Sequence, residues 1–474
     1  MEDNRFANYD DEIRDLVLDF ERTVMQGESQ FYDVDEFETI IDYYFEVNDK
    51  EPLIQALVYA EQMYPDSSEI KQRRAHWYIS NGKFDRAKDI LLTLEEHEPE
   101  NTDIAYSLGV LYGEMGNSEK AIDYYLMAAT DGWQTGRIYE NIAEEYYTLQ
   151  RFDDAIEYYC KALKNDGSSE DTLYNYLDTC EQAECIEDAV SFLDNYAHDH
   201  PYSKVAWYCL GCAYADIGLY DRAEESLELA IAIDKRYSLA YNELSHIQEY
   251  NGQIGQAAST LLHTLDFTTN ASQVYSELGM LYGRHENIPT AIYYLHKSLK
   301  ANPDNADALG ALAMCHLQLD DISMASTYIS KTLTIDPENP DAVYCSALIC
   351  DAAGEYQKAC EIFEQLLDSY RCQEYHFRAY ADFLYRHNDL NTLEQFIDDY
   401  LRLAAPNDSF YITYQAACFF RTNRYNRLKQ VLPHVDSSLL YDICPEMWQN
   451  TNLIPLLPPV DRTAQDDTTT DNHQ

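Results

Sequence analysis

The spacing Cys209-Leu-Gly-Cys212 is the one pair of cysteines in the chain with the separation that zinc sites and redox centres use. A structural zinc site requires a second pair of ligands at a matching separation. These two thiols instead fall inside a stretch with helical periodicity, where cysteine behaves as a small buried apolar residue. We therefore interpret Cys209 and Cys212 as packing residues rather than as metal ligands or a redox pair.

Other patterns that would support catalysis are absent from the sequence. It contains no glycine-rich phosphate loop, no H-E-x-x-H zinc motif, no G-x-S-x-G nucleophile motif and no acidic calcium loop. The histidines are scattered, and His97, His198 and His200 fall at expected helix ends or turns, where they are typical surface residues. The chain is thus predicted to have no catalytic residue, no metal site and no cofactor.

The charge of the chain restricts its partners. Its 84 acidic and 33 basic residues give a formal net charge of −51. Such a field repels nucleic-acid phosphates and anionic lipid surfaces, so neither is an expected partner. Three explanations of the acidity stay open: attraction of a basic partner, solubility of a long molecule, or adaptation of the host to salt.

The cysteines and the start of the chain bear on its compartment. The twelve cysteines show no regular pairing that would suggest a disulfide framework. The start MEDNRFANYDDE lacks the basic and apolar regions of a secretory signal, and no uninterrupted apolar stretch approaches the length of a bilayer span. We expect a cytoplasmic protein with reduced thiols.

The elements that position these residues are set by a 34-residue repeat. Prolines 65, 99, 201, 303 and 337 and glycines 82, 116, 218, 252 and 354 are separated by multiples of 34. Alanine recurs at nine consecutive steps of 34: Ala87, Ala121, Ala155, Ala189, Ala223, Ala257, Ala291, Ala325 and Ala359. Self-similarity at this period is the signature of a repeat architecture.

Each repeat reads as a helix, a turn and a second helix. In the unit from Thr102, Leu108 and Tyr112 precede Gly116, and Ile122 and Tyr125 follow it, all at helical spacing. The eighth residue and the alanine at position twenty are small, as two helices that cross closely require. The proline at position thirty-two removes an N–H and ends the second helix.

These residues resemble the tetratricopeptide repeat family, and the best single copy contains Trp207, Leu210, Gly211, Tyr214, Gly218, Ala223 and Ala230. The resemblance implies an all-α, right-handed superhelical solenoid. About twelve units are expected over residues 34–441, starting at 34, 68, 102, 136, 170, 204, 238, 272, 306, 340, 374 and 408. The end units depart from the pattern: Ile41 and Gln415 replace the small residue, and the last unit is shifted by about one residue.

The segments outside the array are short. Residues 1–33 should form a capping helix, with Ile13, Leu16, Val17, Phe20 and Val24 on one face. Residues 442–460 should form a C-terminal cap and a proline-containing segment, and residues 461–474 a disordered tail. The apolar stretch 449–460 either lies on the protein's own surface or docks on another chain.

In the family, positions two, five, nine, twelve and thirteen of each unit usually face an inner groove. Across residues 34–203 these positions hold twelve acidic residues and one basic residue, whereas across 204–407 they hold six acidic and three basic residues with more apolar ones. We therefore expect a negative, tyrosine-containing part followed by a more apolar part. The residues expected to contact a partner are Tyr106, Glu140, Glu144, Tyr147, Tyr174, Asp178, Glu181, Tyr208, Met280, Met314 and Tyr344.

The leading hypothesis is a non-enzymatic scaffold or adaptor that binds an extended, basic segment of a partner protein in this groove. One alternative is that the acidic residues only solvate an exposed helix face. Another is a self-assembling repeat protein whose end units pair, so the oligomeric state stays open.

Overall fold

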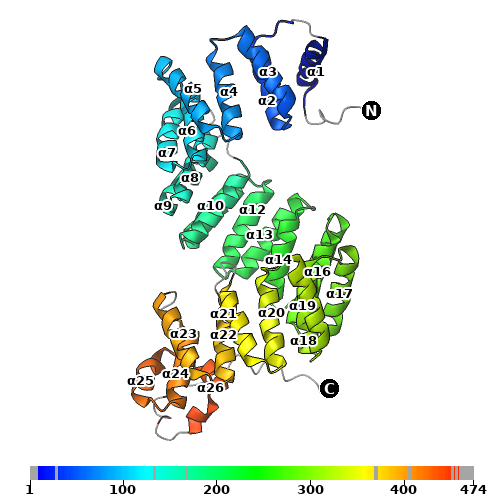
Figure 1. Cartoon of the computed structure of the whole chain (residues 1–474), viewed down its shortest axis with the longest axis vertical. Coiled ribbons are helices and arrows are strands. Elements are labelled where there is room, and N and C mark those ends of the chain that lie inside the picture. Colours follow the sequence, from blue (N-terminus) through cyan, green and yellow to red (C-terminus); the bar gives the residue numbers. More distant parts are fainter. Residues whose placement is uncertain are drawn as a thin grey trace. The chain divides into compact units, whose positions relative to one another are not determined.

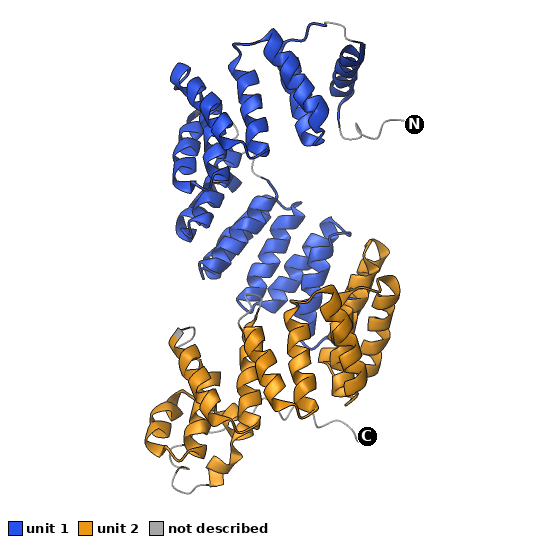
Figure 2. Ribbon diagram, in the orientation of Figure 1, with its two compact units in different colours: residues 1–260 blue, residues 261–474 orange. Residues whose placement is uncertain are grey.

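The computed structural model describes residues 9–26, 30–131, 135–165, 169–367, 372–403, 408–449, 453 and 457. Within these residues all regular secondary structure is helical and there is no β-strand, which confirms the all-α prediction. The chain divides into two compact units, residues 1–260 and 261–474 (Figure 2).

Unit 1 is built from helices α1 to α14 and the start of α15. Their bounds are α1 Asp11–Gln26, α2 Val34–Glu46, α3 Lys50–Met63, α4 Ser68–Ser80, α5 Phe84–His97, α6 Thr102–Glu114, α7 Ser118–Ala128, η2 Ala129–Asp131, α8 Thr135–Thr148, α9 Phe152–Leu163, α10 Asp171–Gln182, α11 Ile186–Asp199, α12 Lys204–Asp216, α13 Tyr220–Ile233, α14 Ser238–Tyr250 and α15 Ile254–His263. Figure 1 shows these helices as successive hairpins stacked side by side.

Unit 2 continues the same pattern of helix pairs from the end of α15. Its elements are η3 Thr264–Asp266, α16 Ala271–Arg284, α17 Ile288–Ala301, α18 Ala306–Gln318, α19 Ile322–Ile335, α20 Pro340–Ala352, α21 Tyr356–Leu367, α22 Glu374–Arg386, α23 Leu390–Leu403, α24 Ser409–Arg421, α25 Tyr425–Val431, η4 Leu432–His434, α26 Ser437–Ile443 and η5 Pro445–Gln449. The even-numbered helices from α2 to α24 are the first helices of successive repeats.

The turn inside each hairpin places one residue in the left-handed region, which ends the first helix. Five of these residues are glycines: Gly82, Gly116, Gly218, Gly252 and Gly354. At the same repeat position the other units have Asn48, Gln150, Glu184, Glu286, Asp320, Asn388 and Asn423. Asn423 and the start of α24 at Ser409 both come one residue late, as Gln415 indicated.

The two helices of a hairpin cross where the eighth residue of the first helix is small. Gly109 on α6 lies directly under Tyr125 of α7, and a Cβ atom added to Gly109 would stand 2.5 Å from the ring atom Cδ1. Gly211 meets Leu227, and Gly279 meets Leu295, in the same way. These close crossings position the first helices, which carry the candidate site.

Gly109→Ala is expected to destabilise the protein by about 1–3 kcal/mol, because the buried Tyr125 ring must move to accept one methyl group. The measurement is urea unfolding followed by circular dichroism. The matched control is Gly255→Ala, since Gly255 is exposed on α15 and nothing lies within 4 Å of its added Cβ. Equal unfolding midpoints for the two variants would show that the crossing tolerates a larger residue.

The first helix and the last described elements pack onto their neighbouring helices. Val17 and Phe20 of α1 join a hydrophobic cluster with Phe37 of α2 and Leu57 of α3. Leu440 and Met447 are buried together with Leu453 in the last cluster of unit 2. Residues 461–474, expected to be disordered, lie outside the described residues, as does most of the 449–460 segment.

Candidate functional site

Carboxylates collect on the first helices in the second half of unit 1. Glu144 lies on α8, Asp178 and Glu181 on α10, and Asp216 on α12, and all four are exposed; Glu243 on α14 is half-buried. We call these five residues the acidic face. Three of them (Glu144, Asp178 and Glu181) were expected from the sequence to contact a partner.

Repulsion from neighbouring carboxylates raises the pKa of three members of the acidic face. Partial removal from water raises the pKa of Glu181, and the charges of Asp216, Asp178 and Glu243 raise it further. The pKa of Asp216 is raised by the same loss of water and by Glu243. The pKa of Glu144 is raised by loss of water and by Glu140 and Glu145. An opposite charge nearby would relieve this repulsion.

Within the described residues, no lysine or arginine forms an ion pair with Glu144, Asp178, Glu181 or Asp216. In this part of the chain the acidic face has one ion pair, between Glu243 and the exposed imidazole of His246 at 3.8 Å. Basic side chains of unit 1 instead stack on tyrosine rings near the hairpin turns: Lys120 on Tyr112, Arg151 on Tyr146 and Arg222 on Tyr214. The acidic face therefore keeps its negative charge.

Two carboxylates at groove positions nearer the N-terminus, Glu38 and Asp42, are compensated by an arginine. Arg73 on α4 binds Asp42 of α2, with Nε 2.8 Å from Oδ1, and lies 3.6 Å from Glu38. The acidity expected over residues 34–203 is thus refined, because Glu38 and Asp42 are paired with Arg73, whereas Glu144, Asp178, Glu181 and Asp216 are paired with no lysine or arginine within the described residues.

Glu140 corrects the sequence-based prediction. Only 7% of this residue is exposed, and its carboxylate accepts hydrogen bonds from Ser169 Oγ at 2.5 Å and Thr172 Oγ1 at 2.6 Å. It therefore fastens α8 to the N-terminal turn of α10 and is not available to a ligand. Gln72, also the fifth residue of its repeat, is likewise buried and accepts a hydrogen bond from Ser107 of the next repeat.

The four tyrosines expected to reach a ligand are all half-buried. Tyr106 accepts a hydrogen bond from Asn141 at 3.2 Å. Asp178 of the acidic face lies beside the Tyr147 hydroxyl and raises the pKa of Tyr147. The hydroxyl groups of Tyr174 and Tyr237 form a hydrogen bond, and the centroid of the Tyr174 ring lies 5.9 Å from that of Tyr208. Tyr147 therefore lies beside the acidic face, whereas Tyr174 and Tyr208 form an aromatic cluster with Tyr237.

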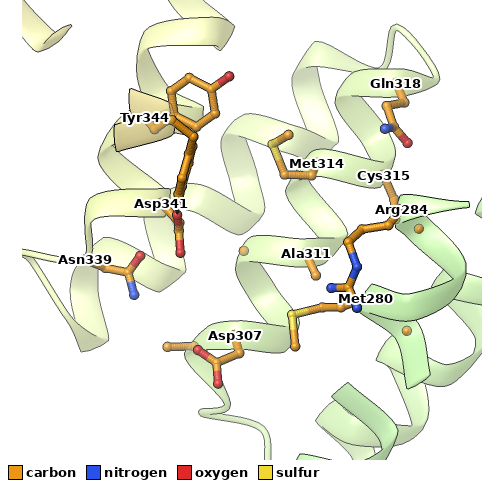
Figure 3. Close-up of a pocket in the computed structure, with 15 residues that line it drawn as sticks. Met280, Arg284, Asp307, Ala311, Met314, Cys315, Gln318, Asn339, Asp341 and Tyr344 are labelled. Carbon is orange, nitrogen blue, oxygen red and sulfur yellow. Dashed lines mark hydrogen bonds between the residues drawn. The ribbon is translucent and has the colours of Figure 1, made fainter. Parts of the chain in front are cut away.

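The three remaining predicted residues come together in unit 2. Met280 on α16, Met314 on α18 and Tyr344 on α20 line one open cavity of about 380 Å³. Figure 3 shows Asp307 and Asp341 on one side of Met280 and Arg284 on the other. Sequence reasoning missed these three charged residues as site residues, although all of them occupy groove positions. We call this cavity the methionine pocket.

The cysteine thiols near the acidic face and the methionine pocket have low reactivity. Burial raises the pKa of Cys315 in the methionine pocket to about 11 and that of Cys212 to about 12. Burial also raises the pKa of Cys209 well above its ordinary value. These thiols are protonated at neutral pH and therefore poor nucleophiles. Among the described residues, no group of three or more histidine, cysteine, aspartate or glutamate side chains could hold a metal ion.

None of the helices in the described part of the chain combines the length and apolar character needed to cross a membrane.

Several family models match parts of the chain. Models described as tetratricopeptide repeat match residues 73–135, 136–168 and 205–237. A model described as anaphase-promoting complex, cyclosome, subunit 3 matches residues 284–366. The matches fall on both units.

Two curated relatives are similar over part of their length. The TPR repeat-containing protein YpiA of Bacillus subtilis is 25% identical over 189 residues, which cover 39% of this chain and 43% of YpiA. The TPR repeat-containing protein MJ1428 of Methanocaldococcus jannaschii is 24% identical over 200 residues, which cover 39% of this chain and 35% of MJ1428. The chain spans less than half of the length of these relatives.

Solved structures with similar helical arrangements include yeast Tom70, with 12% identity, a TM-score of 0.47 and coverage of 94% of both chains. The Cut9–Hcn1 hetero-tetramer of the APC/C has 14% identity and a TM-score of 0.40, and the match covers 86% of this chain and 93% of that one.

Proposed function

This chain belongs to the tetratricopeptide repeat family, and from that premise we propose that it is a non-enzymatic scaffold that binds an extended, basic segment of a partner protein on its acidic face. The repeat fold is typical of protein-interaction scaffolds. The observation that carries the finer proposal is the crowding of Asp178, Glu181 and Asp216, and of Glu144 beside Glu140 and Glu145. None of Glu144, Asp178, Glu181 and Asp216 has a lysine or arginine partner within the described residues. A lysine or arginine from a partner supplies the missing charge.

The geometry of the acidic face suits an extended ligand. Its carboxylates come from four successive first helices, so they are distributed along the stack and do not converge on one point (Figure 1). Tyr147 adds an aromatic ring beside Asp178. A segment with several basic residues can therefore form several weak contacts, each with one carboxylate.

A labelled lysine-rich peptide tests the proposal by fluorescence anisotropy with the full chain. We expect the peptide to bind and its affinity to fall steeply as salt is added, because salt screens exposed charges. A peptide of the same length with glutamine in place of lysine is the control. Equal affinity of the two peptides, or binding that does not respond to salt, would contradict the proposal.

A further inference from the structure

We propose that the methionine pocket is an anchor site for one large apolar side chain of a partner segment, flanked in that segment by a lysine or arginine. This inference rests on the proposed function and adds a second, chemically different subsite to it. The pocket lies entirely within unit 2 and shares no residue with the acidic face.

The lining of the pocket favours an apolar occupant. Met280 and Met314 are flexible, polarizable side chains that adapt to an apolar ligand, and Tyr344 adds an aromatic surface. The Cys345 thiol donates a hydrogen bond to Met314 Sδ, with 3.2 Å between the sulfur atoms, and this contact helps to position the methionine. An apolar cavity of about 150 Å³ already holds a benzene ring, so a volume of about 380 Å³ accommodates a leucine, methionine or phenylalanine side chain with room for its neighbours.

Gly310 on α18 keeps the pocket open. A Cβ atom added there meets no atom within 4 Å, whereas one added to Gly279 would stand 2.5 Å or less from Leu295. Gly279 is therefore needed for the helix crossing, but Gly310 is not needed for packing. The side chain missing at Gly310 leaves the space that the partner's side chain fills.

The edge of the pocket favours a cation beside the anchor. The carboxylate of Asp307 is exposed, and none of the hydrogen bonds or ion pairs found in the described residues involves it. Asp341 adds a second carboxylate, which Tyr375 contacts, and Arg284 is the only basic residue in the lining. Two carboxylates against one guanidinium select a basic neighbour and disfavour an acidic one.

Two amides match the backbone of an extended segment. Asn339 uses its Oδ1 to accept the N–H of Ala342 at 2.9 Å, which leaves its Nδ2 as a donor at the pocket edge. Gln318 lines the opposite part of the pocket and offers both a donor and an acceptor. This combination of amides, an apolar floor and carboxylates corresponds to a peptide segment.

The test uses the full chain labelled with ¹³C at its methionine methyl groups and short peptides in which leucine or alanine is flanked by lysines. The leucine peptide should shift the NMR signals of Met280 and Met314 and leave that of Met127, exposed on α7, unchanged. The alanine peptide should bind about tenfold or more weakly, since it buries less apolar surface. Equal affinities, or no shift at Met280 and Met314, would overturn the proposal.

Gly310→Leu fills the pocket in a helical position that favours leucine over glycine, so the variant is expected to fold. It should abolish the Met280 and Met314 shifts and lower the affinity for the leucine peptide by about tenfold. The matched control, Gly255→Leu, adds the same side chain to an exposed helical glycine in open space and should change neither. Full binding by Gly310→Leu would show that the pocket is not the anchor site.

Asp307→Asn tests the flanking cation separately. It should reduce the preference for lysine over glutamine flanks by up to about fivefold, as one exposed ion pair contributes. Asp221→Asn, in the exposed first turn of α13, is the control and should retain the preference. If Gly310→Leu has no effect while salt still weakens lysine-rich peptides, the pocket fails and the proposed scaffold function stands. If no lysine-rich peptide binds, the proposed scaffold function itself is contradicted.

Discussion

Reversal of Glu144, Asp178 and Glu181 to lysine is expected to weaken binding of a lysine-rich peptide by about a hundredfold or more. Like charges brought together at an interface cost several kcal/mol, and each 1.4 kcal/mol is about a tenfold change in affinity. The three residues are exposed and make no ion pair within the described chain, so the fold does not depend on their charge. Fluorescence anisotropy at low salt measures the effect.

The matched control reverses Asp123 on α7 and Glu225 and Glu228 on α13 to lysine. These residues are also exposed and change the net charge by the same amount, but they lie on second helices. We expect this control to retain most of the affinity. The acidic-face variant should in turn gain affinity for a glutamate-rich peptide. If both variants lose affinity equally, net charge and not the acidic face governs binding.

Glu140→Ala is expected to lower the free energy of unfolding by about 2–4 kcal/mol. Hydrogen bonds to a charged group contribute about 1.5–3 kcal/mol each, and the substitution removes the acceptor of both Ser169 and Thr172. The Thr172 side chain is fully buried and cannot turn to water. The loss also removes a negative charge from the N-terminus of α10, which carries no side-chain cap of its own.

Urea unfolding of Glu140→Ala and Glu140→Gln separates this structural role from ligand binding. The glutamine variant keeps one acceptor oxygen and should lose less stability than alanine. Glu144→Gln, on the same helix but exposed, should leave stability nearly unchanged and weaken peptide binding. A Glu140→Gln protein with native stability and reduced peptide affinity would place Glu140 among the ligand contacts.

The hairpins could be predicted from the sequence because their signals are local. The alanine at position twenty and the small residue at position eight must pack at every crossing, so they recur at each period, as Gly109 and Ala121 do. The turn residue recurs for the same reason, and even the one-residue shift of the last unit is visible from Gln415. Cys209 and Cys212 are likewise assigned to a helix by their place in the repeat.

The exposure and the net charge of the residues at groove positions depend on contacts between successive repeats. Glu140 has its partners 29 and 32 residues later, and Arg73 neutralises Asp42 from 31 residues away. The hydroxyl residues Ser169 and Thr172, about one repeat after Glu140, are the sequence feature that could have suggested its burial. They indicate a hydrogen bond to Glu140 only once the distance between adjacent helices is known.

The sequence by itself determined the period, the helix pairs and the excess of acidic residues at the groove positions of residues 34–203. Only the tertiary structure decided which carboxylates remain uncompensated and that Met280, Met314 and Tyr344 enclose one pocket. The physical reason is that all repeats share the same packing between their two helices. The repeated residues therefore indicate which face of each helix is buried. Hydrogen bonds, ion pairs and cavities between successive repeats depend instead on the individual side chains that adjacent helices bring together.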